Sequence, residues 1–166
     1  MKRFALIIIS ATLFASCSLF QENHEKRPVT DLEASLALDL ALTKINNPYI
    51  WGGNGPSEFD CSGLIIWSYQ QALNQKDIFT IDGIIVDDIT MNTMYNHNSY
   101  IIDFSETMPG DIIYITSDSN YITHGGLVVE VKENSVVFVN ASSYYDKVIL
   151  DEWGIDEIIR EQWIED

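Results

Sequence analysis

Two residues of this 166-residue chain have the chemistry of a nucleophile and its base, and the first is Cys61. Three glycines and a proline between residues 52 and 56 form a turn that leads into a helix beginning at Asp60 or Cys61. A cysteine in the first turn of a helix faces unpaired N–H groups and the positive end of the helix dipole, and both lower the thiol pKa. We therefore predict a reactive thiolate. A buried structural cysteine is the commoner alternative, but the polar neighbours Asp60 and Ser62 argue against it.

The base must be one of three histidines. His24 lies in a polar N-terminal stretch, and His97 lies among Asn and Ser in a predicted solvated loop. His124 precedes two glycines and a Val-rich strand, so it is the one histidine on predicted regular structure. An imidazole beside a thiol can accept its proton during attack on a carbonyl and later protonate the leaving group. We predict this role for His124. A structural histidine at a strand start is the alternative.

The composition is acidic, with 25 Asp and Glu against nine Lys and Arg and a formal net charge of −16. Such a surface repels phosphate backbones, so we expect no nucleic-acid partner. An acidic surface would favour substrates that carry amines, although solubility alone explains the charge. We expect no cofactor, no metal site and a monomer.

The N-terminus predicts a targeting segment. Lys2 and Arg3 precede the apolar run 4–14, which is shorter than the about 20 residues that span a bilayer. Small residues then lead to Cys17. We predict a signal peptide over residues 1–16.

The stretch from Leu13 to Cys17 resembles a bacterial lipobox, in which the cysteine is acylated before cleavage. Phe14 stands where an aliphatic residue is usual, and Leu13 lies one place early. We predict lipidation of Cys17, with ordinary signal cleavage as the alternative. A lipidated Cys17 cannot form a disulfide with Cys61, the other cysteine of the chain. Residues 17–29 are then a tether that holds the domain to a membrane.

Two helices are predicted before residue 74. Thr30 and Glu33 have the spacing of a capping box, and Asn46 to Pro48 end the first helix. Its apolar residues form two neighbouring stripes along the helix. Leu32, Leu36 and Leu40 make up one stripe, and Leu38, Leu42 and Ile45 make up the other. The second helix runs from Asp60 or Cys61 to about Leu73. Residues 74–108 are predicted to be loop-like, with a short apolar interruption at 84–86.

The pattern changes to strands after residue 110. Segments rich in Val and Ile, separated by turn residues, predict strands at 111–116, 126–131, 135–140 and 147–150. Helices followed by strands indicate an α+β domain over residues 30–166, with the helices packed on a small antiparallel sheet.

Four ordered motifs carry a family resemblance: Tyr-x-Trp-Gly-Gly from Tyr49 with Phe-Asp-Cys-Ser-Gly-Leu from Phe59, Met-Pro-Gly-Asp from Met108, the His124 strand, and Val-Phe-Val-Asn-Ala-Ser from Val137. In this order and over about residues 30–150 the chain resembles the NlpC-type cell-wall cysteine peptidases. The resemblance implies a papain-like α+β fold, with the cysteine helix packed against the sheet that holds the histidine.

The resemblance also implies roles for individual residues. Cys61 would attack a peptide carbonyl, with its own backbone N–H as an oxyanion donor, and His124 would serve as its base. Asn140 would orient the imidazole by a hydrogen bond, or else be a polar strand end. Tyr49, Asp60 and Ser62 would bind substrate, the last two at the free amine of a stem peptide. A plain helix N-cap is the competing account of Asp60. We assign three further aromatic residues to packing: Trp51, Trp67 and Tyr69.

The activity implied is that of a cysteine endopeptidase that hydrolyses peptidoglycan stem peptides between the side-chain carboxyl of D-glutamate and a diamino acid. The expected location is the cell envelope, lipid-anchored to a bacterial membrane on the periplasmic or outer-membrane side. Two alternatives stay open: a non-catalytic envelope lipoprotein that binds muropeptides, and an amidase or acyltransferase on the same fold.

Overall fold

The computed structural model describes residues 27–116 and 121–154. The predicted signal peptide, Cys17 and most of the predicted tether lie outside this part of the chain. The elements are α1 (Asp31–Leu42), α2 (Cys61–Leu73), β1 (Phe79–Ile81), β2 (Ile84–Val86), α3 (Met91–Asn98), a short 3₁₀ helix (Phe104–Glu106), β3 (Ile112–Thr116), β4 (Ile122–Val131), β5 (Ser135–Ser142) and β6 (Lys147–Gly154).

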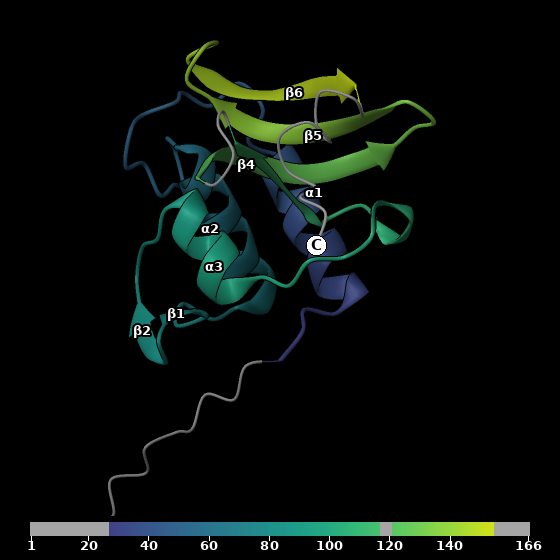
Figure 1. Ribbon diagram of the computed structural model, residues 1–166. Coiled ribbons are helices and arrows are strands. Elements are labelled where there is room, and N and C mark those ends of the chain that lie inside the picture. The colour runs from purple at the N-terminus through teal and green to yellow at the C-terminus, as the bar shows by residue number, and fades with distance from the viewer. Residues whose placement is uncertain (1–26, 117–120, 155–166) are drawn as a thin grey trace, which may run out of the picture.

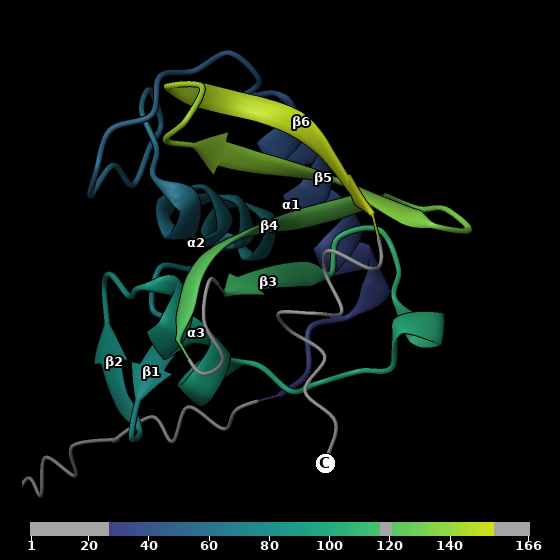
Figure 2. The ribbon, with the colours of Figure 1, turned by 45° about the horizontal axis from the view of Figure 1, so that its top comes forward.

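The predicted α+β class is confirmed. The last four strands form one antiparallel sheet in the order β3-β4-β5-β6, and helices α1 and α2 lie against one of its faces (Figures 1 and 2). All four predicted strands are present. β4 begins four residues earlier than predicted, so His124 lies inside the strand, opposite Ile115 of β3.

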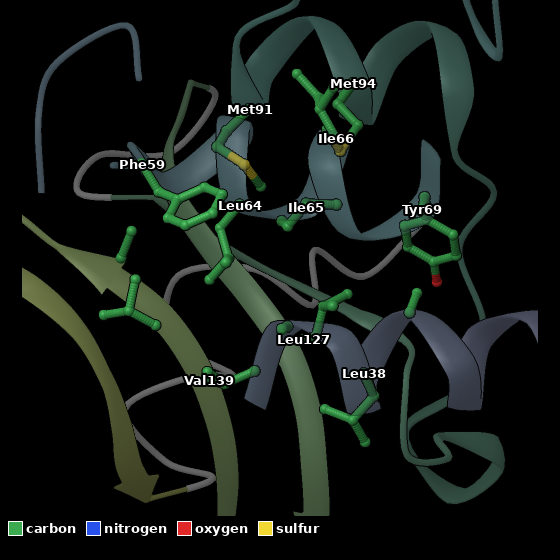
Figure 3. Packing of buried hydrophobic residues seen from close by; sticks show 14 of the residues in the cluster. Leu38, Phe59, Leu64, Ile65, Ile66, Tyr69, Met91, Met94, Leu127 and Val139 are labelled. Atoms are coloured by element: carbon green, nitrogen blue, oxygen red, sulfur yellow. The ribbon is translucent and has the colours of Figure 1, made fainter. Parts of the chain in front are cut away.

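The main core lies between the helices and the sheet. Leu64 and Ile65 of α2, Leu38 of α1, and Leu127 and Val139 of the central strands pack together there (Figure 3). Four of these five side chains are fully buried, and Leu38 is 6% exposed. This core fixes α2, the helix that begins at Cys61, against the strands that carry His124 and Asn140.

Helix α1 begins as predicted, and one of its two predicted apolar stripes packs in the core. Thr30 accepts a hydrogen bond from the Glu33 N–H, and the Glu33 carboxylate accepts one from the Thr30 N–H, which makes a complete capping box. The stripe of Leu32, Leu36 and Leu40 is wrong as a core face, because Leu32 is 70% exposed. The buried residues of α1 are mostly small: Ala34, Ala37, Leu38 and Ala41.

The small side chains on the buried face of α1 let the segment that contains Gly110 approach the helix closely. Gly110 has φ +98, and a Cβ added to it would lie 2.5 Å from the Ala34 carbonyl oxygen. Larger side chains on this face would hold the loop before β3 away from the helix. The predicted stripe of Leu38, Leu42 and Ile45 is confirmed, because Leu38 is buried and the other two pack against the core.

Residues 74–108 contain more regular structure than the predicted loop. β1 and β2 form a hairpin closed by Asp82 and Gly83, whose φ values are 50° and 82°. Asp-Gly between two apolar runs is a strong hairpin signal that the prediction overlooked. Helix α3 was also missed, and it places His97 in its last turn, 3.5 Å from the Asp82 carboxylate, rather than in a loop.

No helix within residues 27–116 and 121–154 is long and apolar enough to cross a membrane.

Candidate active site at the start of helix α2

The N-terminus of α2 is fixed by Asp60. Its Oδ1 accepts hydrogen bonds from the Gly63 N–H at 2.7 Å and the Ser62 hydroxyl at 3.1 Å, and its Oδ2 accepts one from the Gly52 N–H at 2.9 Å. Asp60 is therefore the N-cap of α2 and also joins the preceding loop to it. The helix-cap account of Asp60 is confirmed, and its contact with a substrate amine stays a prediction.

Two glycines allow the loop before α2 to lie directly on the helix. The Asp60 N–H donates to the Gly53 carbonyl at 2.8 Å. A Cβ on Gly63 would lie 2.0 Å from the Gly53 oxygen, so this first-turn position has no room for a side chain. Gly63 was not among the predicted site residues, although a glycine inside a helix pattern indicates close approach of another chain segment.

The Cys61 thiol is half-buried, and its surroundings change the prediction made from the helix dipole. Burial and the charge of Asp60 raise its pKa to about 11, although the backbone N–H groups of Ser62 and Cys61 act in the opposite direction. The expectation of a lowered pKa is therefore wrong for the free protein. A thiol with this pKa needs a base that takes its proton as it attacks.

His124 and Asn140 lie close together on neighbouring strands β4 and β5. The His124 Nε2 and Asn140 Oδ1 atoms are 3.0 Å apart. An amide oxygen only accepts hydrogen bonds, so Nε2 must carry the proton, and Nδ1 keeps the free lone pair of a base. Asn140 is 1% exposed, so this orientation is held inside the protein.

The pKa of His124 is lowered, mainly by burial, while the hydrogen bond to Asn140 and the charge of Asp151 raise it. The imidazole is thus neutral near pH 7, which is the state a base requires. Gly126 makes the approach of β4 to β5 possible, because an added Cβ there would lie 2.4 Å from the Val139 carbonyl oxygen. This glycine was also overlooked in the sequence, where a glycine inside a strand pattern indicates such a contact.

The predicted site residues thus fall into two groups. The first group is at the start of α2 and contains Cys61. The second group is the His124–Asn140 pair on β4 and β5, and α2 packs against both of these strands. Among the described residues no hydrogen bond joins the Cys61 thiol to the His124 ring. Catalytic hydrogen bonds are often long without substrate and tighten in the complex.

The remaining predicted residues lie around Cys61. Tyr49 is half-buried, and its pKa is raised by burial, then by Cys61 and by Asp60, which places its phenol near both. Ser62 is 6% exposed, and its hydroxyl donates to Asp60. Its predicted contact with substrate would have to break or share that bond. No cluster of His, Cys, Asp and Glu side chains that could hold a metal is found in the described ranges.

The packing assignments of three aromatic residues divide. Tyr69 is buried and its hydroxyl donates to the Gly110 carbonyl at 2.9 Å, and Trp67 packs edge-on against Phe59. Both assignments are confirmed. Trp51 is 86% exposed, so its assignment to packing is wrong.

With this geometry in place, comparison with known proteins identifies the family. The model of the NlpC/P60 family matches residues 46–163, which include Cys61, His124 and Asn140. The chain belongs to the NlpC/P60 family. The match begins just before Tyr49 and includes all four motifs quoted above.

Relatives of this NlpC/P60 chain are named as endopeptidases. A protein of Mycobacterium tuberculosis (strain H37Rv) named a probable endopeptidase is 30% identical over 112 residues, which are 68% of this chain and 24% of that protein. A probable endopeptidase of Corynebacterium glutamicum is 59% identical over 34 residues, 20% of this chain and 16% of the relative. This chain spans about a quarter of the length of the mycobacterial relative.

Solved structures of the family share the fold. NlpC1 from Trichomonas vaginalis is 29% identical with a TM-score of 0.55, over 76% of this chain and 41% of that one. NlpC2 from the same organism is 30% identical with a TM-score of 0.55, over 75% and 44%. An N-acetylmuramoyl-L-alanine amidase from Bacteroides uniformis, 14% identical with a TM-score of 0.51 over 77% and 93%, is similar in fold alone.

Proposed function

We propose that this domain is a cysteine endopeptidase that hydrolyses peptidoglycan stem peptides at the bond between the side-chain carboxyl of D-glutamate and the diamino acid. The observation that carries the proposal is the hydrogen bond from His124 Nε2 to Asn140 Oδ1, which leaves Nδ1 free as a base on strands packed against the Cys61 helix. The endopeptidase names of the relatives support the reaction class.

The reaction begins with proton transfer. Substrate binding displaces water from the thiol, Nδ1 of His124 takes the Sγ proton, and Sγ attacks the carbonyl carbon of the peptide. The first-turn N–H of Cys61 donates to the oxygen that becomes negative. The imidazolium that forms is stabilised by the Asn140 oxygen and by the negative charge of Asp151, the two groups that raise the His124 pKa.

The second half returns the proton and releases the enzyme. The imidazolium protonates the leaving amine of the diamino acid, the C–N bond breaks, and a thioester remains on Cys61. His124 then removes a proton from water, whose oxygen attacks the thioester carbonyl. The acid is released, and Sγ recovers its proton from His124.

The test is mass spectrometry of muropeptides after incubation with the purified full-length protein. The expected products are a fragment that ends in D-glutamate and a fragment that begins with the diamino acid. Cleavage between the sugar and L-alanine would instead indicate an amidase, and no cleavage, with muropeptides still bound, would indicate the non-catalytic lipoprotein.

Membrane attachment is a second part of the proposal. We propose that Cys17 carries lipid and that residues 17–29 connect the domain to a bacterial envelope membrane. Support comes from the short apolar run before Ala15-Ser16-Cys17. A tether of about a dozen residues would keep Cys61 within about 45 Å of the membrane surface, plus the width of the domain.

A further inference from the structure

Four apolar side chains are exposed beside the candidate active site. Trp51 is 86% exposed, Tyr144 85%, Tyr145 54% and Ile50 47%. They lie on two segments, the loop before α2 and the turn between β5 and β6, and are called here the aromatic rim. Packing explains neither Trp51 nor Tyr144, since each keeps more than four fifths of its surface in solvent. Adjacent exposed apolar groups of this kind mark binding surfaces.

The two segments of the aromatic rim are held side by side by the backbone. The Tyr49 N–H donates to the Asp146 carbonyl at 3.0 Å, and the Asn46 N–H and Asn47 carbonyl bond to Val148 at 2.9 and 2.8 Å. In Figures 1 and 2 the loop before α2 and the β5–β6 turn accordingly lie next to each other. Tyr144 and Tyr145 also contact each other edge-on, with ring centroids 4.9 Å apart.

The aromatic rim is continuous with the candidate site. The Gly52 N–H, which follows Trp51 directly, bonds to the carboxylate of Asp60, the residue before Cys61. Tyr49, two residues before Trp51, is close enough to Cys61 and Asp60 for both to raise its pKa. A ligand that binds at Cys61 can therefore extend onto the rim.

We propose that the aromatic rim binds the sugar of a stem peptide that is still attached to its glycan. This inference rests on the proposed function and specifies its substrate. The scissile bond follows the second residue of the stem, and even with the longer side-chain linkage of D-glutamate and the lactyl group the distance to the sugar is on the order of 10–15 Å, so the muramic acid must lie near the site. The apolar C–H face of a pyranose ring stacks on Trp and Tyr rings, while its hydroxyls suit an exposed, polar border.

Charge favours this ligand over a membrane surface. The chain has a formal net charge of −16, and the rim is bordered by Glu58 and Asp146 as well as by Lys147. Binding to anionic lipid requires clustered basic residues, which the rim lacks among the described residues. A glycan-linked stem also has no free amine at its alanine. With this substrate Asp60 has no amine to bind, so its functions are to cap α2 and to accept the hydrogen bond from Gly52.

The test compares two substrates that both lack a free amine: a disaccharide-linked stem tripeptide and the N-acetylated tripeptide. Wild-type full-length protein should give a higher kcat/KM for the sugar-linked substrate. Trp51→Ala and Tyr144→Ala should each reduce that preference about 2- to 12-fold, the range expected for the loss of one ring contact. Tyr100→Ala, which removes an exposed aromatic residue (68%) outside the rim, should leave the preference unchanged.

A second measurement separates this inference from the proposed function. The Cys61→Ser protein should bind the peptide-free disaccharide, and Trp51→Ala in that background should weaken binding. If the protein binds the disaccharide but neither the wild type nor any variant cleaves peptides, the proposed hydrolysis is wrong, whereas the aromatic rim is still a sugar-binding site. Equal kcat/KM for both substrates in the wild type would overturn the rim as a sugar site, as would Trp51-dependent binding to anionic vesicles without disaccharide binding.

Discussion

Gly63→Ala is the substitution that most directly tests how the site is positioned. An alanine at this helical position gains about 1 kcal/mol of helix propensity over glycine. Its Cβ would, however, lie 2.0 Å from the Gly53 oxygen and 2.6 Å from Asn54 Oδ1, where real Cβ contacts are essentially never under 3.0 Å. Because the closer neighbour is backbone, the loop before α2 must move away by about 1 Å or more. Overpacking of this kind costs about 1–3 kcal/mol.

We expect the clash to exceed the propensity gain, with a net loss of about 1–2 kcal/mol in the free energy of unfolding. The displaced loop also carries the Gly53 carbonyl that binds the Asp60 N–H at 2.8 Å. A shift of about 1 Å at Cys61 or its substrate can reduce the rate about 100-fold. The assays are urea unfolding and kcat/KM on the stem tripeptide, in conditions where the variant is fully folded.

Gly83→Ala is the matched control. Gly83 has φ +82 and nothing within 4 Å of an added Cβ, so alanine there introduces backbone strain of about 1–2 kcal/mol without a clash. It lies in the β1–β2 turn and should retain full activity at a similar loss of stability. If the Gly63→Ala protein has wild-type stability and activity, the packing argument is refuted. If both variants lose activity equally, the loss of stability alone explains the loss of activity.

Three further predictions concern other parts of the chain. Because burial lowers the pKa of His124, kcat/KM should rise with pH through a midpoint below the ordinary histidine pKa. Asn140→Ala should retain partial activity with that midpoint moved lower still, because the hydrogen bond to Asn140 raises the His124 pKa; a midpoint that moves up would contradict the pairing. Asp60→Ala should lower the free energy of unfolding by about 1–3 kcal/mol in a urea assay, through loss of the cap and of the Gly52 bond. Asp60→Asn keeps an acceptor for the Gly63 N–H but turns its NH2 toward the Gly52 N–H, so it should lose about 0.5–1.5 kcal/mol, less than the alanine variant. Cys17→Ser should move the protein from the detergent phase to the aqueous phase or leave it uncleaved; a wild-type protein that never incorporates labelled fatty acid would show that the lipobox interpretation is wrong.

Local signals with a clear physical cause were predictable from the sequence. The capping box at Thr30, the start of α2 at Cys61 and the four strands of the sheet each depend on short-range chemistry or on Val- and Ile-rich segments between turn residues. The hydrogen bond between His124 and Asn140 was expected from the family resemblance and is present. The catalytic roles of these residues stay predictions.

The features that were missed depend on tertiary contacts. Helix α3 contains three Asn, which is a weak helix former, and Met91 and Met94 are its only buried residues. Ala34 of α1 is buried where Gly110 comes close to the helix, which no leucine period reveals. The raised pKa of Cys61 likewise follows from burial and from Asp60, both of which act against the helix dipole.

The most direct test of the central claim is the cleavage rate of the Cys61→Ser protein on the glutamyl-diamino acid stem peptide. A hydroxyl has no accessible anionic form in this site, so hydrolysis should fall below detection while circular dichroism and urea unfolding match the wild type. Turnover by the folded Cys61→Ser protein at a substantial fraction of the wild-type rate would contradict the assignment of Cys61 as the nucleophile.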